Sequence, residues 1–276
     1  MLRCRNLFPN QAFGIAKVTL TGGRRDKVFI TLIFISVISF LAVIPAASSL
    51  SMRQVREVAV NLSLSTISFV SLVLTVFFGV HLIYRDMEQR FVHAVLPLPI
   101  SRGSYLIGKF LGLSAILAIG LTILSLFSSI GILIASATYK SQIPMLWENY
   151  VAAVFFEYLE LLILASFAVF FSSFSTTVFL PLFSTVSVYI IGNVTQSVAE
   201  YIASPYGQKL PRFSIYISKA VYYIFPNLTA FDLKAKAIYS LRMSFSDLSF
   251  IFLYAVLYIL IILSASLLVF RRREIA

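Results

Sequence analysis

The sequence contains little charge. Only 12% of its 276 residues are Asp, Glu, Lys or Arg, about half the share usual in a soluble domain. Hydrophobic residues make up 59%, and several apolar runs of roughly 18 or more residues carry no charge. This pattern excludes an ordinary soluble protein and predicts an all-α polytopic membrane protein.

Cysteine and histidine are also scarce. Cys4 is the single cysteine, so the chain can form no intrachain disulfide. His81 and His93 have no third ligand at a suitable spacing, and we therefore expect no metal site. No nucleophile and base form a recognisable catalytic set, so we expect that the chain is not an enzyme.

The apolar runs predict six transmembrane helices in a single domain covering residues 1–276, because one crossing needs about 20 residues. The predicted spans are residues 28–47, 64–83, 110–137, 151–171, 178–198 and 248–270. The 39 uncharged residues from 161 to 199 are too many for one crossing, and we divide them at the Ser/Thr cluster of residues 172–177. Arg56 and Glu57 are assigned to the loop after the first span.

The basic residues predict the orientation. Residues 1–27, expected to lie along the cytoplasmic interface, contain six Lys or Arg, the loop at 84–109 four, and the C-terminal tail three. The two short loops of the other face contain two and one. The positive-inside rule therefore places both termini and the 84–109 loop in the cytoplasm. It also explains the net charge of +11 without a nucleic-acid partner.

The outer segment, residues 199–247, holds six Lys or Arg and conflicts mildly with that rule. Short helices are predicted at 214–225 and 230–242. Thr229 would cap the second helix, with Asp232 three residues on as in a capping box.

The loop at 84–109 predicts a short helix over residues 86–96. Asp86 and Glu88 would begin it, near the positive end of its dipole, and Pro97 and Pro99 would end it. Ser101 or Ser104 would then cap the next helix.

This predicted loop helix has an apolar face formed by Met87, Phe91 and Val95, at positions i, i+4 and i+8. Glu88 and Arg90 flank the face. An apolar face between charges suits a helix that docks in a groove of a partner protein. It would equally suit an amphipathic helix lying on lipid headgroups, and the residues alone leave both alternatives open.

A phosphate-loop spacing also occurs in this region, at Gly103, Gly108 and Lys109. Phe110 follows, and it has no hydroxyl group for magnesium; no strand precedes the motif. We therefore expect no nucleotide site. Lys109 would instead anchor the third span, and Gly108 and Gly112 would allow a second helix to approach closely.

Glu157 and Glu160 lie inside the fourth predicted span, on one helical face. Counted from Trp147, Glu157 would be roughly 15 Å deep. Acidic groups at such depth usually face a cavity or a partner. They would line a translocation path or bind a proton or cation. Alternatively, they form a structural pair satisfied by Ser, Tyr or Arg of neighbouring helices, or lie at the interface because the span begins later.

The loop resembles the cytoplasmic loop between spans two and three of ABC transporter permeases of the type-2 exporter family. The matching run is Glu88…Pro97-Leu98-Pro99-Ile100-Ser101-Arg102…Gly108-Lys109. Residues 23–27, the run Phe225-Pro226-Asn227 and the basic tail at 271–273 are also similar to that family.

The resemblance implies a six-span permease in the plasma membrane (the inner membrane of a bacterium). It would form a homodimer or heterodimer with a second permease copy and bind two copies of a cytoplasmic ABC ATPase. The loop would carry a coupling helix, and residues 199–247 would form short outer helices at the exit. The positions carried over from the family are Glu88, Phe91, Val95, Pro99 and Arg102.

We therefore expect an ATP-driven exporter subunit embedded among membrane lipids. The chain would hold no cofactor, because ATP and Mg would bind to the partner ATPase. The alternatives are an ion-coupled secondary transporter that uses Glu157 and Glu160, and a membrane scaffold or assembly factor. The substrate stays open.

Overall fold

A computed structural model describes residues 7–24, 26, 27, 29–31, 33, 34, 36–38, 40, 41, 54–88, 101–138, 145–175, 177–205 and 211–272. Most of these residues are helical, and none of them lies in a β-strand. The predicted all-α class is therefore confirmed.

Within the described ranges, five helices are long and apolar enough to cross a membrane. They are α3 (Val55–Glu88), α5 (Arg102–Thr138), α6 (Trp147–Phe174), α7 (Phe179–Ala203) and α10 (Phe245–Arg272). Even the shortest, α7, has 25 residues and a length of about 37 Å, more than the ~30 Å of a hydrocarbon core. Phe29–Ile38 is a shorter apolar helix that includes residues outside the described part.

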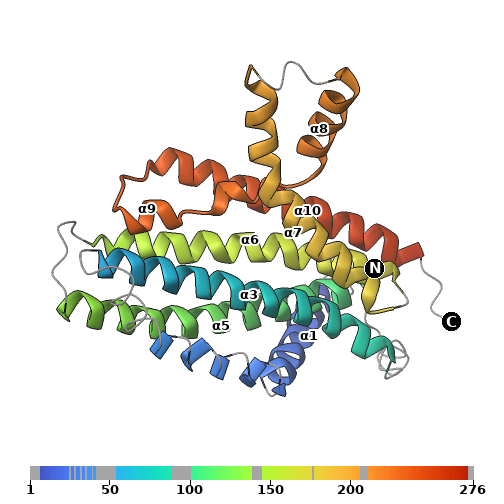
Figure 1. Cartoon of the computed structure of the whole chain (residues 1–276). Coiled ribbons are helices and arrows are strands. Elements are labelled where there is room, and N and C mark those ends of the chain that lie inside the picture. Colours follow the sequence, from blue (N-terminus) through green and yellow to red (C-terminus); the bar gives the residue numbers. More distant parts are fainter. Residues whose placement is uncertain are drawn as a thin grey trace.

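The ends of the helices define two ends of the bundle (Figure 1). At the end named here the loop end, α3 finishes, α5 begins and α10 finishes. At the opposite end, named the far end, α3, α6 and α10 begin. The described ends of the 84–109 loop therefore lie at the same end of the bundle as the end of α10.

Helix α6 lies at the centre of the bundle, in contact with α3, α5, α7 and α10. Every residue from Leu159 to Val169 except Leu162 is buried, so this stretch has no side facing lipid. A helix that is apolar all round is expected to be buried on all sides. Polar groups on α6 therefore have to find partners inside the protein.

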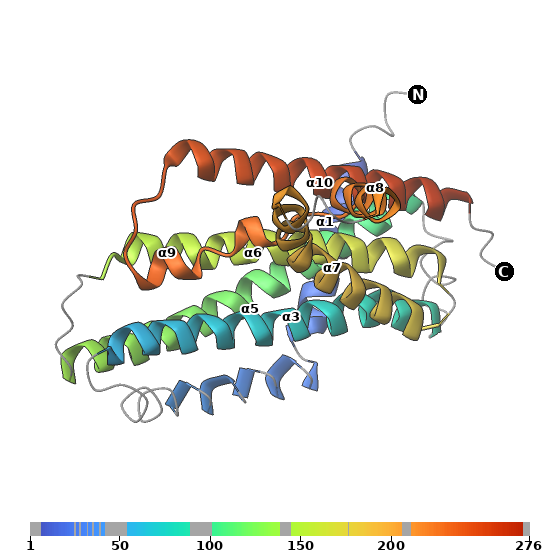
Figure 2. The same ribbon diagram turned by 45° about the horizontal axis from the view of Figure 1, so that its top comes forward.

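Helix α1 (Leu7–Arg24) crosses the bundle near the loop end and packs against α5 (Figure 2). The contact depends on Gly108 and Gly112 of α5. A Cβ atom at Gly108 would lie 2.7 Å from the Ala12 carbonyl oxygen, and one at Gly112 would lie 2.5 Å from the Thr19 Cβ. The predicted close approach at these glycines is confirmed, and its partner is the N-terminal helix. Phe13, on α1, stays 73% exposed.

Two serine positions mark helix boundaries as predicted. Helix α6 ends just before Ser175, whose Oγ accepts a hydrogen bond from the Thr177 N–H (3.2 Å). This confirms the division of the long uncharged run at the Ser/Thr cluster. Ser101 caps α5, because its Oγ accepts a hydrogen bond from the Ser104 N–H (3.0 Å).

Two charged pairs lie elsewhere than predicted. Arg56 and Glu57 are not in a loop: they belong to the first turn of α3, are buried, and form an ion pair of 3.3 Å between Nη2 and Oε1. Asp86 and Glu88 do not begin a separate helix, because α3 continues through both. No glycine or proline interrupts the chain between His81 and Glu88, so the helix extends beyond its apolar stretch.

In the outer segment, the first predicted helix is confirmed and the second prediction is wrong. Helix α8 (Arg212–Ile224) forms where expected and makes a hairpin with the end of α7 that projects from the side of the bundle (Figure 1). In place of a helix at 230–242 there are the 3₁₀-helix η3 (Thr229–Phe231) and the short α9 (Lys234–Ile238).

The cap of α9 also differs from the prediction. Leu233 occupies the cap position without a side-chain hydrogen bond, and Asp232, one residue before it, accepts a hydrogen bond from the Lys234 N–H (3.0 Å). Thr229 instead donates its hydroxyl to the carbonyl oxygen of Asn193 on α7 (3.0 Å). The tertiary contact to α7 thus prevails over the local capping pattern.

The contact between α1 and α5 gives a first prediction. Replacing Gly112 with Leu should lower the free energy of unfolding by about 1–3 kcal/mol, because the larger side chain meets Thr19 and the Ala16 carbonyl oxygen. Thermal unfolding in lipid nanodiscs measures the effect. Gly131→Leu is the matched control on the same helix, since a Cβ there meets nothing within 4 Å. Equal unfolding temperatures for the two variants would contradict the packing argument.

Candidate functional site

Two of the predicted coupling positions, Glu88 and Arg102, lie at the loop end. Glu88 is the last described residue of α3, and Arg102 is the first residue of α5. Phe91, Val95 and Pro99 lie outside the described residues. The structure therefore locates the two ends of the loop but describes no contact of its central part.

The start of α5 is firmly joined to other helices. Tyr105 stacks on Phe270 of α10, with 6.0 Å between the ring centroids. The buried Lys109, one turn further along α5, lies with its Nζ 5.8 Å from the centre of the Tyr105 ring, which is the geometry of a cation–π contact. Both residues belong to α5, so this contact is internal to the helix, and the role of Lys109 as an anchor of the third span stays a prediction. A displacement of the loop would be transmitted to α10 and α1.

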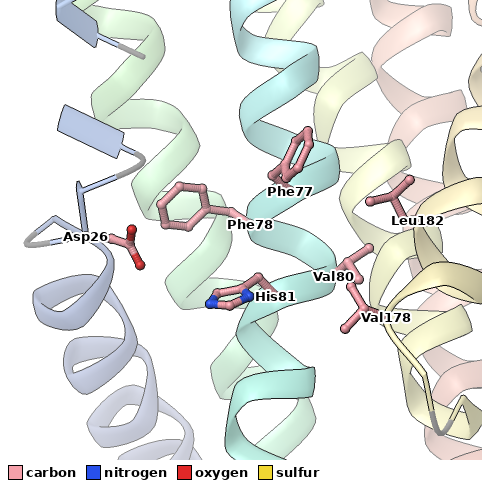
Figure 3. A pocket seen from close by; sticks show the side chains of 7 residues that line it. All are labelled: Asp26, Phe77, Phe78, Val80, His81, Val178 and Leu182. Carbon is pink, nitrogen blue, oxygen red and sulfur yellow. The ribbon is translucent and has the colours of Figure 1, made fainter. Parts of the chain in front are cut away.

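A cavity of about 240 Å³ opens between the segment around Asp26, α3 and the start of α7. Its lining is mostly apolar, and Figure 3 shows the residues that form it: Asp26, Phe77, Phe78, Val80, His81, Val178 and Leu182. Its polar side chains are Asp26 and His81, from different segments of the chain. The cavity suits an apolar group that carries a polar end.

Glu157 is buried within α6 and accepts a hydrogen bond from Ser68 of α3. The distance from the Ser68 Oγ to the Glu157 Oε1 is 2.6 Å. Glu160 is buried one turn further along α6. The side chain of Asn193, on α7, lies within hydrogen-bonding reach of it. Helices α3 and α7 thus supply polar partners for the two carboxyl groups.

The outer segment supplies charges to the same place. Lys234, the first residue of α9, and Asp232, which lies just before that helix, act electrostatically on both carboxyl groups. The cluster therefore contains three acidic groups and one basic group. Lys234 provides positive charge near Glu157 and Glu160, which lowers the cost of holding carboxyl groups inside the bundle.

Helix α3 faces the carboxyl pair of α6 with one side and the cavity with another. Ser68 and Gly79 are eleven residues apart, about three turns, and share the face toward α6, where a Cβ at Gly79 would lie 2.7 Å from the Ala168 Cβ. Phe77 and His81, which line the cavity, lie about half a turn round the helix from Ser68. The structure does not bring the two sites together.

The partners of Glu157 and Glu160 were not identified from the sequence. A partner Ser on a neighbouring helix agrees with the structural alternative. Ser68 and Asn193 stand among many Ser and Asn residues, so no local signal marks them. The sequence did contain a signal for Lys234 and Asp232. Each is a charged residue between apolar runs, and such residues need a partner of opposite charge or a hydrogen bond.

The return segment, defined here as residues 225–244, is attached to α7 and α10. The Leu228 N–H donates to the Gly192 carbonyl oxygen (3.1 Å), and the Asn227 N–H donates to the Tyr254 hydroxyl oxygen (3.0 Å). Leu228 is fully buried, and a Cβ at Gly192 would lie 2.6 Å from its Cγ. This end of the return segment therefore needs glycine at position 192.

No group of three or more His, Cys, Asp and Glu side chains is placed to hold a metal ion within the part of the chain that the structure describes. The cluster around Glu157 is accordingly a set of hydrogen bonds and charges on neighbouring helices. It can hold or exchange a proton or a positively charged group, since its basic member is a single lysine.

Comparison with known proteins gives one match. The family model described as ABC-2 family transporter protein matches residues 14–275. A search of curated proteins found no match. The matched range includes every candidate residue discussed above.

The hydrogen bond between Ser68 and Glu157 gives a second prediction. Ser68→Ala should lower the free energy of unfolding by about 1–3 kcal/mol, because it leaves a buried acceptor without its donor. Ser65→Ala, an exposed change one turn away on α3, should have little effect.

A double-mutant cycle with Glu157→Gln, measured by thermal unfolding in nanodiscs, isolates the pairwise contribution. We expect the effect of Ser68→Ala to shrink in the Glu157→Gln background, because that substitution removes the carboxyl group that Ser68 binds. Strictly additive effects would show that the two side chains do not interact.

Proposed function

The chain belongs to the ABC-2 family of transporter proteins, and we propose that it is the membrane subunit of an ATP-driven exporter. It is the permease component of an ABC transporter, and a separate ATPase subunit would supply the energy. The observation that carries the proposal is the family match over residues 14–275, almost the whole chain. ATP and Mg would bind to the ATPase partner, in two copies, and not to this chain.

A sixth span is part of the proposal. Helix α1 contacts the first turns of α5 and therefore lies at the loop end, whereas α3 begins at the far end. The chain between Arg24 and Val55 has to run from one end to the other. Phe29 and Phe40, within it, are buried, and Phe29 meets Phe78 of α3 edge-on with 6.2 Å between ring centroids. These contacts support a first span at residues 28–47.

We place the loop end in the cytoplasm, with both termini, as the distribution of basic residues favours. The ATPase would then meet the loop between Glu88 and Arg102. Phe91 and Val95 would enter a groove on the ATPase, and Pro99 and Arg102 would form the turn into α5. The joining of α5 to α1 and α10 supports this assignment, since it gives the loop a route to the rest of the bundle.

The substrate would enter the membrane part near the cavity between α3 and α7. The cavity opens near the loop end, and its apolar lining with Asp26 and His81 suits an amphiphilic molecule. A second permease copy, identical or related, would complete the path. Export follows from the resemblance to type-2 exporters.

An ion-coupled transporter is the second candidate, and the buried pair Glu157 and Glu160 is the observation that favours it. Such a transporter would work without an ATPase and would stop when an ionophore collapses the ion gradients. A scaffold or assembly factor would do neither. ATP-dependent movement of substrate that persists with the ionophore separates the exporter from both.

The proposed coupling helix gives a third prediction. Phe91→Ala should weaken ATPase binding by roughly 30-fold and lower substrate-stimulated ATP hydrolysis in proportion, because a buried aromatic side chain often dominates a helix-in-groove contact. Glu88→Ala should have a smaller effect in the same direction. Both are measured with the reconstituted complex in nanodiscs.

Phe245→Ala is the control, since Phe245 is an aromatic residue, 86% exposed, at the far end of α10. Its ATP hydrolysis should match that of the unaltered chain. The coupling assignment fails if Phe91→Ala, with an unchanged unfolding temperature, binds and stimulates the ATPase normally.

A further inference from the structure

We propose that Asn149 is a positioning residue that holds the return segment (residues 225–244) closed over the far end of α6, and that outward release of substrate requires this contact to open. The transport part of the inference rests on the proposed function. The closure itself is a property of this chain alone.

Asn149 lies in the first turn of α6 and is buried, although it is a polar residue at the end of a helix. Its Nδ2 donates two hydrogen bonds, to the carbonyl oxygen of Lys236 (3.1 Å) and to that of Leu241 (2.9 Å). The first carbonyl belongs to α9 and the second to the chain that leaves it. One side chain amide thus fastens both sides of the turn after α9.

The turn is closed by a backbone hydrogen bond from the Leu241 N–H to the Lys236 carbonyl oxygen (3.1 Å), and Asn149 supports it from outside. Ser240 adopts a φ of 51°, a left-handed conformation that glycine usually occupies. The chain from Tyr239 to Arg242 is otherwise mostly exposed, and only Ser240 is half-buried. Because two carbonyl groups of this turn bind the same amide, Asn149 helps to fix a conformation that the local sequence does not favour.

The two ends of the return segment are held differently. At its start, Leu228 and Phe231 are fully buried and a backbone hydrogen bond joins Leu228 to Gly192. Apolar burial continues through Leu233 into α9, where Ala237 is buried. The turn beyond α9 is mostly exposed, and its described contacts to α6 include the two hydrogen bonds of Asn149. Apolar burial resists separation, whereas hydrogen bonds are readily exchanged with water. Opening therefore begins at the turn around Ser240, and the buried start of the return segment is the hinge.

Opening at the turn would expose the carboxyl pair of α6. Helix α9 packs against α6 and α3, and Lys234 acts electrostatically on Glu157 and Glu160. Movement of α9 would withdraw this positive charge from both carboxyl groups. A positively charged group that passes the exit could then take its place, so Lys234 serves as the counter-ion of the closed state.

The test measures the accessibility of a residue beneath the return segment. Ala237, on α9, is 3% exposed. In the full chain with Cys4→Ser, Ala237→Cys is labelled in nanodiscs with a membrane-impermeant maleimide. Asn149→Asp has almost the same shape but places an acceptor against two carbonyl oxygens. We expect it to raise the labelling rate at least about tenfold, because two hydrogen bonds are lost.

Asn149→Gln keeps an amide donor and should restore slow labelling in part. Asn61→Asp, an exposed change on α3, is the matched control and should leave the rate unchanged. Lys234→Met should raise the labelling rate, because it removes the positive charge near the carboxyl pair. Lys236→Met removes the same charge from the same short helix but not from the carboxyl pair, and should leave the labelling rate unchanged. General loosening is monitored by Ala255→Cys, a fully buried position on α10.

Unchanged labelling of Ala237→Cys in the Asn149→Asp variant would overturn the proposal. Equal increases at Ala237→Cys and Ala255→Cys would also overturn it, because they would indicate a destabilised bundle. The ATPase subunit is absent from these measurements. If ATP and the ATPase then leave the labelling rate unchanged in the unaltered chain, the proposed ATP coupling fails while the closure by Asn149 stands.

Discussion

The burial of two carboxyl groups in α6 is the constraint on which much of this structure depends. Helix α6 has no lipid-facing side over its central turns, so Glu157 and Glu160 must be satisfied by neighbouring elements. Helix α3 supplies Ser68, α7 supplies Asn193, and the outer segment supplies Lys234. An outer segment that would otherwise lie at the surface is thereby drawn against the core of the bundle.

The two ends of the molecule are linked through long helices that have fixed contacts at both. At the loop end, α5 is joined to α1 through two glycines and to α10 through Tyr105. Toward the far end, the return segment leads directly into α10, and Tyr254 of α10 accepts a hydrogen bond from it. A force applied to the loop by an ATPase would therefore reach the return segment through α10.

Local patterns predicted those parts of the fold that depend on the backbone alone. Ser101 and Ser175 were found as boundaries because a hydroxyl group next to a helix end has few other uses. Gly108 and Gly112 were found because small residues one turn apart permit close packing. Arg56 and Glu57 were wrongly predicted to lie in a loop. They form an ion pair with each other, and this lets both be buried at the start of a helix. The cap of α9 was misassigned because Thr229 is used by α7. The cluster around Glu157 joins four separate elements, and no spacing in the sequence records which of them meet.

The central claim is that this chain moves substrate only with energy from a separate ATPase. The most direct measurement is to purify the chain from its native membrane in nanodiscs and to determine the composition and ATP hydrolysis of the complex by native mass spectrometry and a phosphate assay. We expect two permease chains with two ABC ATPase subunits, and hydrolysis that disappears when the ATPase subunits are removed. A chain that transports in response to an ion gradient, with no ATPase bound, would contradict the claim.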